Sequence, residues 1–210
     1  MKVLQMPICF EQIISETAKI RVWHITEDES FFLEKVTLQK NISHPHKRLQ
    51  HLAGRYLLAH LFPDFPHELI EIADTRKPFL PGEMYHFSIS HCGNYAAAFV
   101  SRNERVGIDI EIITPKVELI KNKFLNEEEL QNQSYLTLSM PYHHWLTLLW
   151  SCKEAIFKWY GEGTVDFREH LHIISVDKET VQVKLLKGQP QHLTIQYKFF
   201  DSMVLAWVRS

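Results

Sequence analysis

Cysteine is scarce in this chain of 210 residues. The three cysteines, Cys9, Cys92 and Cys152, stand far apart and form no CxxC pair. This spacing fits neither a disulfide framework nor a zinc site made of thiolates. A reducing, cytoplasmic location is therefore expected.

The chain also lacks a surplus of basic residues and any long apolar run. Its 23 basic and 25 acidic residues give a formal net charge of −2, so the broad positive field that nucleic-acid binding needs is absent. No apolar run approaches the roughly 20 residues that cross a bilayer. The first residues lack the hydrophobic core and cleavage site of a signal peptide. We therefore expect neither nucleic acid nor a membrane as a partner.

Hydrophobic residues make up 45% of the sequence, which is enough to bury a core. Short apolar segments with strand periodicity alternate with amphipathic segments of helical periodicity. The strands are expected at residues 3–10, 19–25, 69–72, 85–89, 95–101, 106–112, 170–176, 180–186, 192–199 and 203–208. The helices are expected at residues 27–40, 43–62 with Ser43 as N-cap, 117–123, 126–133 and 142–160.

The order strand, helices, strands occurs once on each side of about residue 104. This order predicts an α/β fold of two pseudo-symmetric lobes, 1–104 and 105–210, each with a small sheet packed on helices. No sequence repeat with a fixed period accompanies it, so the symmetry would be structural only.

The strongest chemical signal is a strand that carries two carboxylates. In residues 106–112, VGIDIEI, apolar residues alternate with Gly107, Asp109 and Glu111. Alternate residues of a strand point to opposite faces, so both carboxylates lie on one face, about 7 Å apart. Hard oxygen donors without a Cys or His favour Mg²⁺ or Ca²⁺. Gly107 leaves room for a bulky group near the backbone. An isolated pair of this kind is more often a solvated strand face.

A second signal lies in residues 150–159, WSCKEAIFKW, which show the apolar stripe of a helix. Trp150, Glu154 and Lys158 fall together on another face, one turn apart. Glu154 would supply a third carboxylate, and Lys158 a cation for a phosphate or a leaving oxygen. The alternative is an ordinary surface Glu–Lys pair. A large aromatic residue on the same face argues against that alternative.

A third signal is the polar end of a strand at Ser90, His91 and Cys92. Three alternatives stay open for it: a phosphate-binding Ser and His, a catalytic Cys–His pair, or a polar turn. Upstream, Arg48 and Arg55 are seven residues apart on one expected helix. Seven residues make two turns, so both side chains can reach one anion, unless they belong to a solvated helix edge.

Taken together, Ser90-His91, the GIDIE segment 107–111 and the WSCKEAIFK segment 150–158 resemble the 4′-phosphopantetheinyl transferase superfamily. The similarity is to its larger, two-lobed, monomeric type. The resemblance implies an active site between the lobes, with coenzyme A in the cleft and Mg²⁺ on its pyrophosphate. The metal ligands that it implies are Asp109, Glu111 and Glu154.

The resemblance also implies a further glutamate after a Phe-containing helix start, and Glu129 in residues 123–130 aligns best with it. Cys92 stands where relatives often carry a small residue or serine, which would make the site oxidisable. The contacts that the resemblance implies for the adenosine 3′-phosphate of coenzyme A are Lys77, Ser90, His91 and, from position and charge, Arg48 and Arg55.

The implied reaction transfers the phosphopantetheine arm of coenzyme A to a serine of an apo acyl or peptidyl carrier protein and releases 3′,5′-ADP. Glu154 or Glu129 would take the serine proton, and Lys158 would stabilise the departing 3′,5′-ADP. The carrier would dock near residues 124–133, where Lys116, Lys121 and Lys123 suit an acidic partner.

Two rival functions remain at this stage. A non-catalytic module that binds coenzyme A or a nucleotide would keep the fold without the transfer. A metal-dependent phosphohydrolase would use the same carboxylate strand with water in place of a carrier serine. Because two lobes in one chain complete the site, a monomer is expected.

Overall fold

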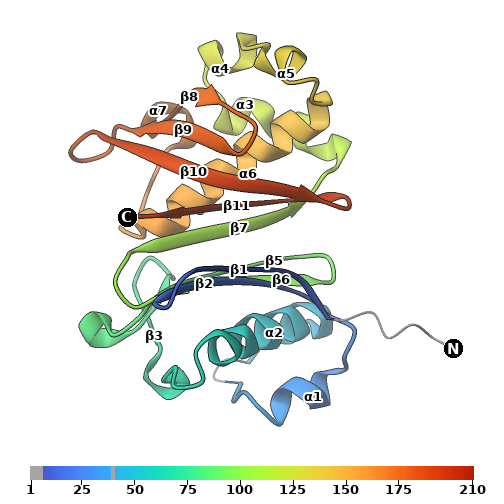
Figure 1. Ribbon diagram of the computed structural model, residues 1–210, viewed down its shortest axis with the longest axis vertical. Coiled ribbons are helices and arrows are strands. Elements are labelled where there is room, and N and C mark those ends of the chain that lie inside the picture. The colour runs from blue at the N-terminus through green and yellow to red at the C-terminus, as the bar shows by residue number, and fades with distance from the viewer. Residues whose placement is uncertain (1–6, 39–40) are drawn as a thin grey trace, which may run out of the picture. The chain divides into compact units, whose positions relative to one another are not determined.

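The computed structural model describes residues 7–38 and 41–210 and divides into two compact units. Unit 1 is Met1–Val106 and unit 2 is Gly107–Ser210. Each unit is a mixed α/β structure in which a sheet packs on helices (Figure 1). No helix within the described ranges is long and apolar enough to cross a membrane.

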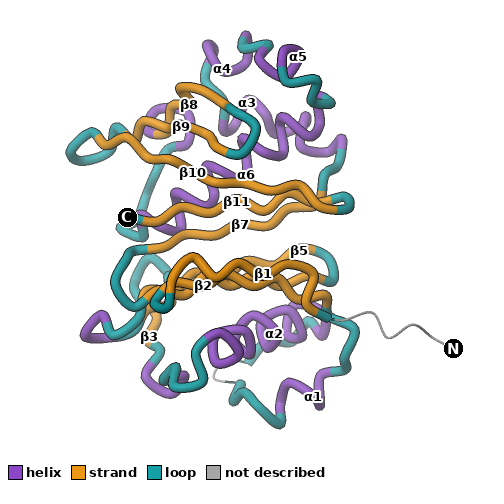
Figure 2. Tube along the Cα trace, in the orientation of Figure 1, coloured by secondary structure: helices purple, strands orange, loops and turns teal. Residues whose placement is uncertain are grey.

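Unit 1 contains a four-stranded sheet with the strand order β1-β2-β6-β5. Neighbouring strands in this order are antiparallel, as the two hairpins β1–β2 and β5–β6 require (Figure 2). The strands are β1 (Ile8–Ser15), β2 (Ala18–His24), β5 (His86–Cys92) and β6 (Tyr95–Ser101).

One long helix, α2 (Pro45–Leu61), covers this sheet. It begins after His44, whose ring accepts a hydrogen bond from the backbone of Lys47, and a proline at the first helical position suits the start of a helix. At Gly54 an added Cβ would lie 2.6 Å from Ile89 Cγ2 of β5. The absence of a side chain therefore lets α2 approach β5 closely, and this contact fixes the position of the next residue, Arg55.

The remaining elements of unit 1 are short. They are α1 (Glu29–Leu33), the 3₁₀ helices η1 (His67–Leu69) and η2 (Pro81–Glu83), and the paired strands β3 (Glu71–Ile72) and β4 (Pro78–Phe79). The β3–β4 pair stays at two residues, because Pro78 has no N–H to donate to the ladder.

Unit 2 contains a five-stranded sheet with the strand order β7-β11-β10-β9-β8. The strands are β7 (Val106–Ile112), β8 (Leu171–Val176), β9 (Thr180–Leu185), β10 (Gln191–Phe200) and β11 (Met203–Arg209). The last four form a continuous antiparallel meander (Figure 2).

The long helix α6 (Tyr142–Tyr160) packs against this sheet, mainly on β11. It ends at Gly161, whose φ of 69° is the left-handed conformation that stops a helix and favours glycine. The shorter helices are η3 (Pro115–Ile120), α3 (Lys121–Phe124), α4 (Glu127–Gln131), α5 (Ser134–Thr137) and α7 (Phe167–His170).

The α/β class is confirmed, and the segments 95–101, 106–112 and 142–160 have the predicted bounds. The first strand was placed too early: it runs from Ile8 to Ser15, and residues 3–6 of the prediction lie outside the described residues. The helix expected at 27–40 is wrong in length. Only α1 forms there, and residues 39–40 lie outside the description. The strand expected at 69–72 is shorter: β3 forms at Glu71–Ile72, whereas Leu69 is the last residue of η1. The helices α5 and α7 were not predicted.

Candidate functional site

Strand β7 and helix α6 bring the acidic and basic residues of unit 2 together. Gly107 permits this approach, since an added Cβ would lie 2.1 Å from the carbonyl oxygen of Ala155 and 2.7 Å from Trp159 Cβ. The room that Gly107 leaves is thus filled by α6. The face of β7 that carries Asp109 and Glu111 therefore looks toward this helix.

Asp109 is the buried centre of the arrangement, with 3% of its surface exposed. Lys158 Nζ donates to its Oδ1 at 2.6 Å, and Ser151 Oγ donates to its Oδ2 at 2.9 Å. Ser151 was not predicted as a site residue. Its spacing contained the signal, because residues 151 and 158 are two helical turns apart and share a face.

Glu111 and Glu154 flank Asp109. Trp150 Nε1 donates to Glu111 Oε1 at 3.1 Å. Burial, and then the charge of Asp109, raise the pKa of Glu111 to about 7. The same two causes raise the pKa of Glu154 to about 7, and Lys158 offsets part of the shift. We call Asp109, Glu111 and Glu154 the carboxylate cluster.

The carboxylate cluster fits a hard divalent cation by its donor chemistry. Its donors are carboxylate oxygens, and the pKa values of Glu111 and Glu154 are raised first by burial and then by repulsion from Asp109, which a cation would relieve. In the arrangement seen across residues 7–38 and 41–210, no three His, Cys, Asp or Glu side chains already converge as a metal-binding group. Lys158 supplies positive charge at Asp109 instead, so a metal ion would compete with this ammonium for the carboxylate.

Glu129 does not fit the catalytic role that was predicted for it. It is 5% exposed, and its Oε2 accepts from Lys153 Nζ at 2.7 Å and from the backbone of Asn126 at 2.9 Å. Its Oε1 accepts from the backbone N–H of Ile173 at 2.8 Å. Both oxygens are therefore occupied by bonds that hold the fold together, and a buried, ion-paired carboxylate is poorly placed to accept a substrate proton.

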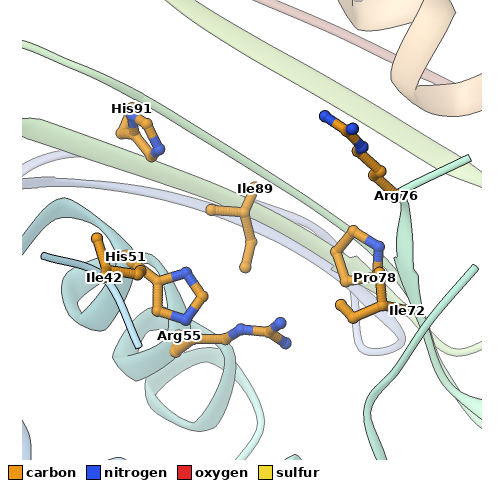
Figure 3. A pocket seen from close by; sticks show the side chains of 8 residues that line it. All are labelled: Ile42, His51, Arg55, Ile72, Arg76, Pro78, Ile89 and His91. Carbon is orange, nitrogen blue, oxygen red and sulfur yellow. The ribbon is translucent and has the colours of Figure 1, made fainter. Parts of the chain in front are cut away.

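Unit 1 contains a separate pocket of about 640 Å³. Figure 3 shows its basic side chains, with His51 and Arg55 reaching from α2, His91 from β5, and Arg76 from the segment before β4. We call this cavity the unit 1 pocket. Its lining residues in the described part of the chain are Ile42, His51, Arg55, Ile72, Arg76, Pro78, Ile89 and His91, which include no carboxylate.

Arg55 is the unusual member of the unit 1 pocket. Only 7% of it is exposed, and its Nη1 is buried without a hydrogen-bond partner among residues 7–38 and 41–210. Desolvation lowers its pKa to about 10. Nearby His67 has a lowered pKa, first because of its own burial and then because of the charge of Arg55. A buried cation of this kind normally has an anionic partner, so the unit 1 pocket has the properties of an anion site.

The other predicted contacts of unit 1 are arranged differently. Arg48 forms two hydrogen bonds with Glu29, at 2.6 and 2.8 Å, and a third with the carbonyl of Ile42. The structure therefore does not bring Arg48 and Arg55 to one anion. Lys77 and Ser90 are not among the residues that line the pocket, whereas His91 is. His51 was missed, although it lies one helical turn before Arg55.

Two kinds of comparison with known proteins, with a family model and with individual relatives, agree on one family. A family model described as "4′-phosphopantetheinyl transferase superfamily" matches residues 105–208. The chain is 34% identical over 167 residues to "Enterobactin synthase component D" of Escherichia coli (strain K12), which covers 76% of this chain and 75% of that protein.

Two further relatives match over shorter lengths. "Enterobactin synthase component D" of Salmonella austin is 32% identical over 116 residues, 55% of this chain and 49% of that protein. "4′-phosphopantetheinyl transferase psf-1" of Bacillus pumilus is 33% identical over 121 residues, 53% of this chain and 50% of that protein. In these two cases the match spans about half of the relative's length.

Proposed function

The chain belongs to the 4′-phosphopantetheinyl transferase superfamily, and we propose that it transfers the phosphopantetheine arm of coenzyme A to a serine of an apo acyl or peptidyl carrier protein. The second product would be 3′,5′-ADP. The observation that carries this proposal is the carboxylate cluster, with Lys158 bonded to its buried central member Asp109. We further propose that the protein works as a cytoplasmic monomer.

In this proposal Asp109, Glu111 and Glu154 would hold Mg²⁺ on the pyrophosphate of coenzyme A. When bound, the metal neutralises charge on the phosphate that is attacked and helps to orient it. Asp109 is held by Ser151 and Lys158 before any metal arrives. This fixed orientation lowers the reorganisation that metal and substrate binding would require.

Glu154 is assigned the role of proton acceptor for the carrier serine. Without a metal, burial and then the charge of Asp109 raise its pKa to about 7, and a bound cation would favour the ionised form that accepts a proton. Lys158, one turn later on α6, is assigned the stabilisation of the departing phosphate. Its ammonium group lies 2.6 Å from Asp109, beside the carboxylate that is proposed to hold the metal.

The unit 1 pocket is assigned to the 3′-phosphate of the adenosine. The buried guanidinium of Arg55, whose Nη1 has no partner within the described residues, would donate a charge-assisted hydrogen bond to a phosphate oxygen. His91 and Arg76 line the same pocket and would add donors. Lys77 and Ser90 remain further candidates from the resemblance, and Arg48 loses support because Glu29 already pairs with it.

The carrier protein is proposed to dock on unit 2 around η3, α3 and α4. Leu119 is 83% exposed there, and Lys116 and Lys123 are exposed beside it in the sequence. Lys121 contributes less, because it already pairs with Glu118 at 3.2 Å. An exposed leucine among lysines suits an acidic carrier surface with an apolar contact at its centre.

The direct test is incubation of the protein with coenzyme A, Mg²⁺ and an apo acyl carrier protein, followed by intact mass spectrometry of the carrier. A mass gain equal to the phosphopantetheine arm, lost with EDTA, supports the proposal. Coenzyme A binding without transfer to any of several acyl and peptidyl carriers would favour a non-catalytic binding module. Release of phosphopantetheine or phosphate without a carrier would favour a phosphohydrolase.

A further inference from the structure

Lys153 is a fully buried lysine that the reaction does not use directly. It is 0% exposed and lies on α6 between Ser151 and Glu154. Its Nζ donates to the carbonyl of Phe124 at 2.7 Å, to the carbonyl of Phe167 at 2.9 Å and to Glu129 Oε2 at 2.7 Å. A lysine ammonium has three protons, so these three bonds satisfy it completely.

Glu129 completes the same network from the other side. It closes a capping box with Asn126 at the start of α4, and it also accepts from the backbone of Ile173 in β8. The Lys153–Glu129 pair thus joins α6 to the ends of α3 and α4, to α7 and to β8. An ion pair that is buried and fully bonded holds its partners in one geometry, because removal of either member leaves an uncompensated charge.

The two residues whose carbonyls bind Lys153 also hold an aromatic side chain. The ring of Phe124 lies 5.2 Å from that of Trp150, edge to face at 66°, and the ring of Phe167 lies 5.7 Å from it. Trp150 in turn donates its Nε1–H to Glu111 Oε1. The contacts therefore run from Lys153 through two backbone carbonyls and two phenyl rings to Trp150 and one carboxylate of the cluster.

We propose that the Lys153–Glu129 pair is a positioning device that orients Trp150 and, through its indole N–H, Glu111. This assignment rests on the proposed function, in which Glu111 is a ligand of Mg²⁺ and must be correctly oriented. Glu129 then acts through Trp150 and touches neither substrate nor metal. Its predicted importance for the reaction is kept, but its role changes from proton acceptor to support of a metal ligand.

The first test follows Trp150 itself and needs no turnover. The full chain, labelled with 5-fluorotryptophan, contains five tryptophans, and Trp150→Phe assigns the Trp150 signal in the ¹⁹F spectrum by its loss. Glu129→Gln should shift or broaden that signal. Glu128→Gln, at an exposed neighbour on α4, is the matched control and should leave it in place. An unchanged Trp150 signal in folded Glu129→Gln protein overturns the proposal.

The second test measures coupling. Mn²⁺ binding, followed by electron paramagnetic resonance, should weaken about tenfold in Trp150→Phe, which keeps ring packing and removes the N–H, and by a similar factor in Glu129→Gln. If Glu129 acts through Trp150, the double variant should bind Mn²⁺ no more weakly than Trp150→Phe alone. Fully additive losses would show that Glu129 acts by another route and would overturn the proposal.

Glu129→Gln leaves a buried ammonium without its counter-charge, so a variant with an intact ion pair guards against misfolding. Phe167→Leu removes one ring beside half-buried Trp150 and should shift the Trp150 signal and weaken Mn²⁺ binding. If the Trp150 signal and the Mn²⁺ affinity both stay at wild-type values, the ring contacts do not orient Trp150 and the proposal fails. A coupled ¹⁹F and Mn²⁺ response without transfer to any carrier would instead refute the proposed function and leave the positioning role standing.

Discussion

The two units of this protein differ in whether their buried charged side chains have bonded partners. In unit 2 the carboxylate cluster contains Asp109, which is bonded to Lys158 and Ser151, so positive charge and a hydroxyl group already partly satisfy it. In the described part of unit 1, one nitrogen of the buried Arg55 guanidinium has no partner, and the residues that line its pocket include no acid. The carboxylate cluster of unit 2 therefore suits phosphate chemistry with a cation, whereas the unit 1 pocket suits the binding of an anion.

The largest expected effect tests the carboxylate cluster of unit 2. Asp109→Asn keeps the side-chain shape but removes the charge that Lys158 and a metal ion would share. Transfer to the carrier should fall by about a thousandfold, the order seen when a central electrostatic group of an active site is removed. Initial rates from carrier mass spectrometry measure it, with exposed Asp177→Asn as control. Activity within a few-fold of wild type would remove Asp109 from the site.

The next largest effect tests the unit 1 pocket. Arg55→Met should weaken coenzyme A binding by about one to two orders of magnitude, the value of a charge-assisted bond to a phosphate. Dephospho-coenzyme A, which lacks the 3′-phosphate, should bind wild type and variant equally. Isothermal titration calorimetry compares the two ligands.

Arg48→Met is the matched control for that substitution, because Arg48 is already paired with Glu29. It should change the affinity for both ligands little. An equal loss for coenzyme A and dephospho-coenzyme A in Arg55→Met would show that the unit 1 pocket does not recognise the 3′-phosphate.

A smaller effect concerns the pH dependence of stability without metal. The pKa values of Glu111 and Glu154 are raised from 4.5 to about 7 in the folded protein, so folding favours their protonated forms. That contribution is fully present below the unfolded pKa and is lost as the pH rises through about 7. The free energy of unfolding should therefore decline between about pH 4.5 and about pH 7, and Glu154→Gln should remove its share of that decline, on the order of 2 kcal/mol.

Denaturant titrations across that pH range, in EDTA, measure the free energy of unfolding of wild type and Glu154→Gln. Exposed Glu127→Gln is the control and should follow wild type. Saturating Mg²⁺ should flatten the wild-type profile, because a cation favours the ionised carboxylates. A Glu154→Gln profile with the wild-type slope would contradict the electrostatic description of the carboxylate cluster.

The smallest effect concerns the carrier surface. Leu119→Ala should raise the KM for the carrier by a few-fold, since truncation of one leucine at an interface costs about 1 kcal/mol. The KM for coenzyme A should not change. Steady-state kinetics with each substrate varied in turn separate the two. A change confined to coenzyme A would place the carrier elsewhere.

Much of this architecture follows from local patterns. The alternation in residues 106–112 determined both the strand and the shared face of Asp109 and Glu111, and a helix was expected where α4 forms. Weakly periodic segments were predicted less well. The helix expected at residues 27–40 is only α1, and the strand expected at residues 69–72 is the two-residue β3. Short segments take their structure from neighbours that the local sequence does not contain.

The sequence by itself determined the motifs shared with the family, the α/β class and the presence of carboxylates suited to bind a cation. Only the tertiary structure decided how those charges are used. Ser151 and Asp109 are 42 residues apart, and Lys153 and Glu129 are 24 residues apart, so their bonds depend on how α6 packs. The structure likewise buried Arg55 without a partner for Nη1 and paired Arg48, although both lie on α2 with the same charge. Periodicity predicts which face a residue occupies, whereas desolvation and hydrogen bonding depend on what packs against that face.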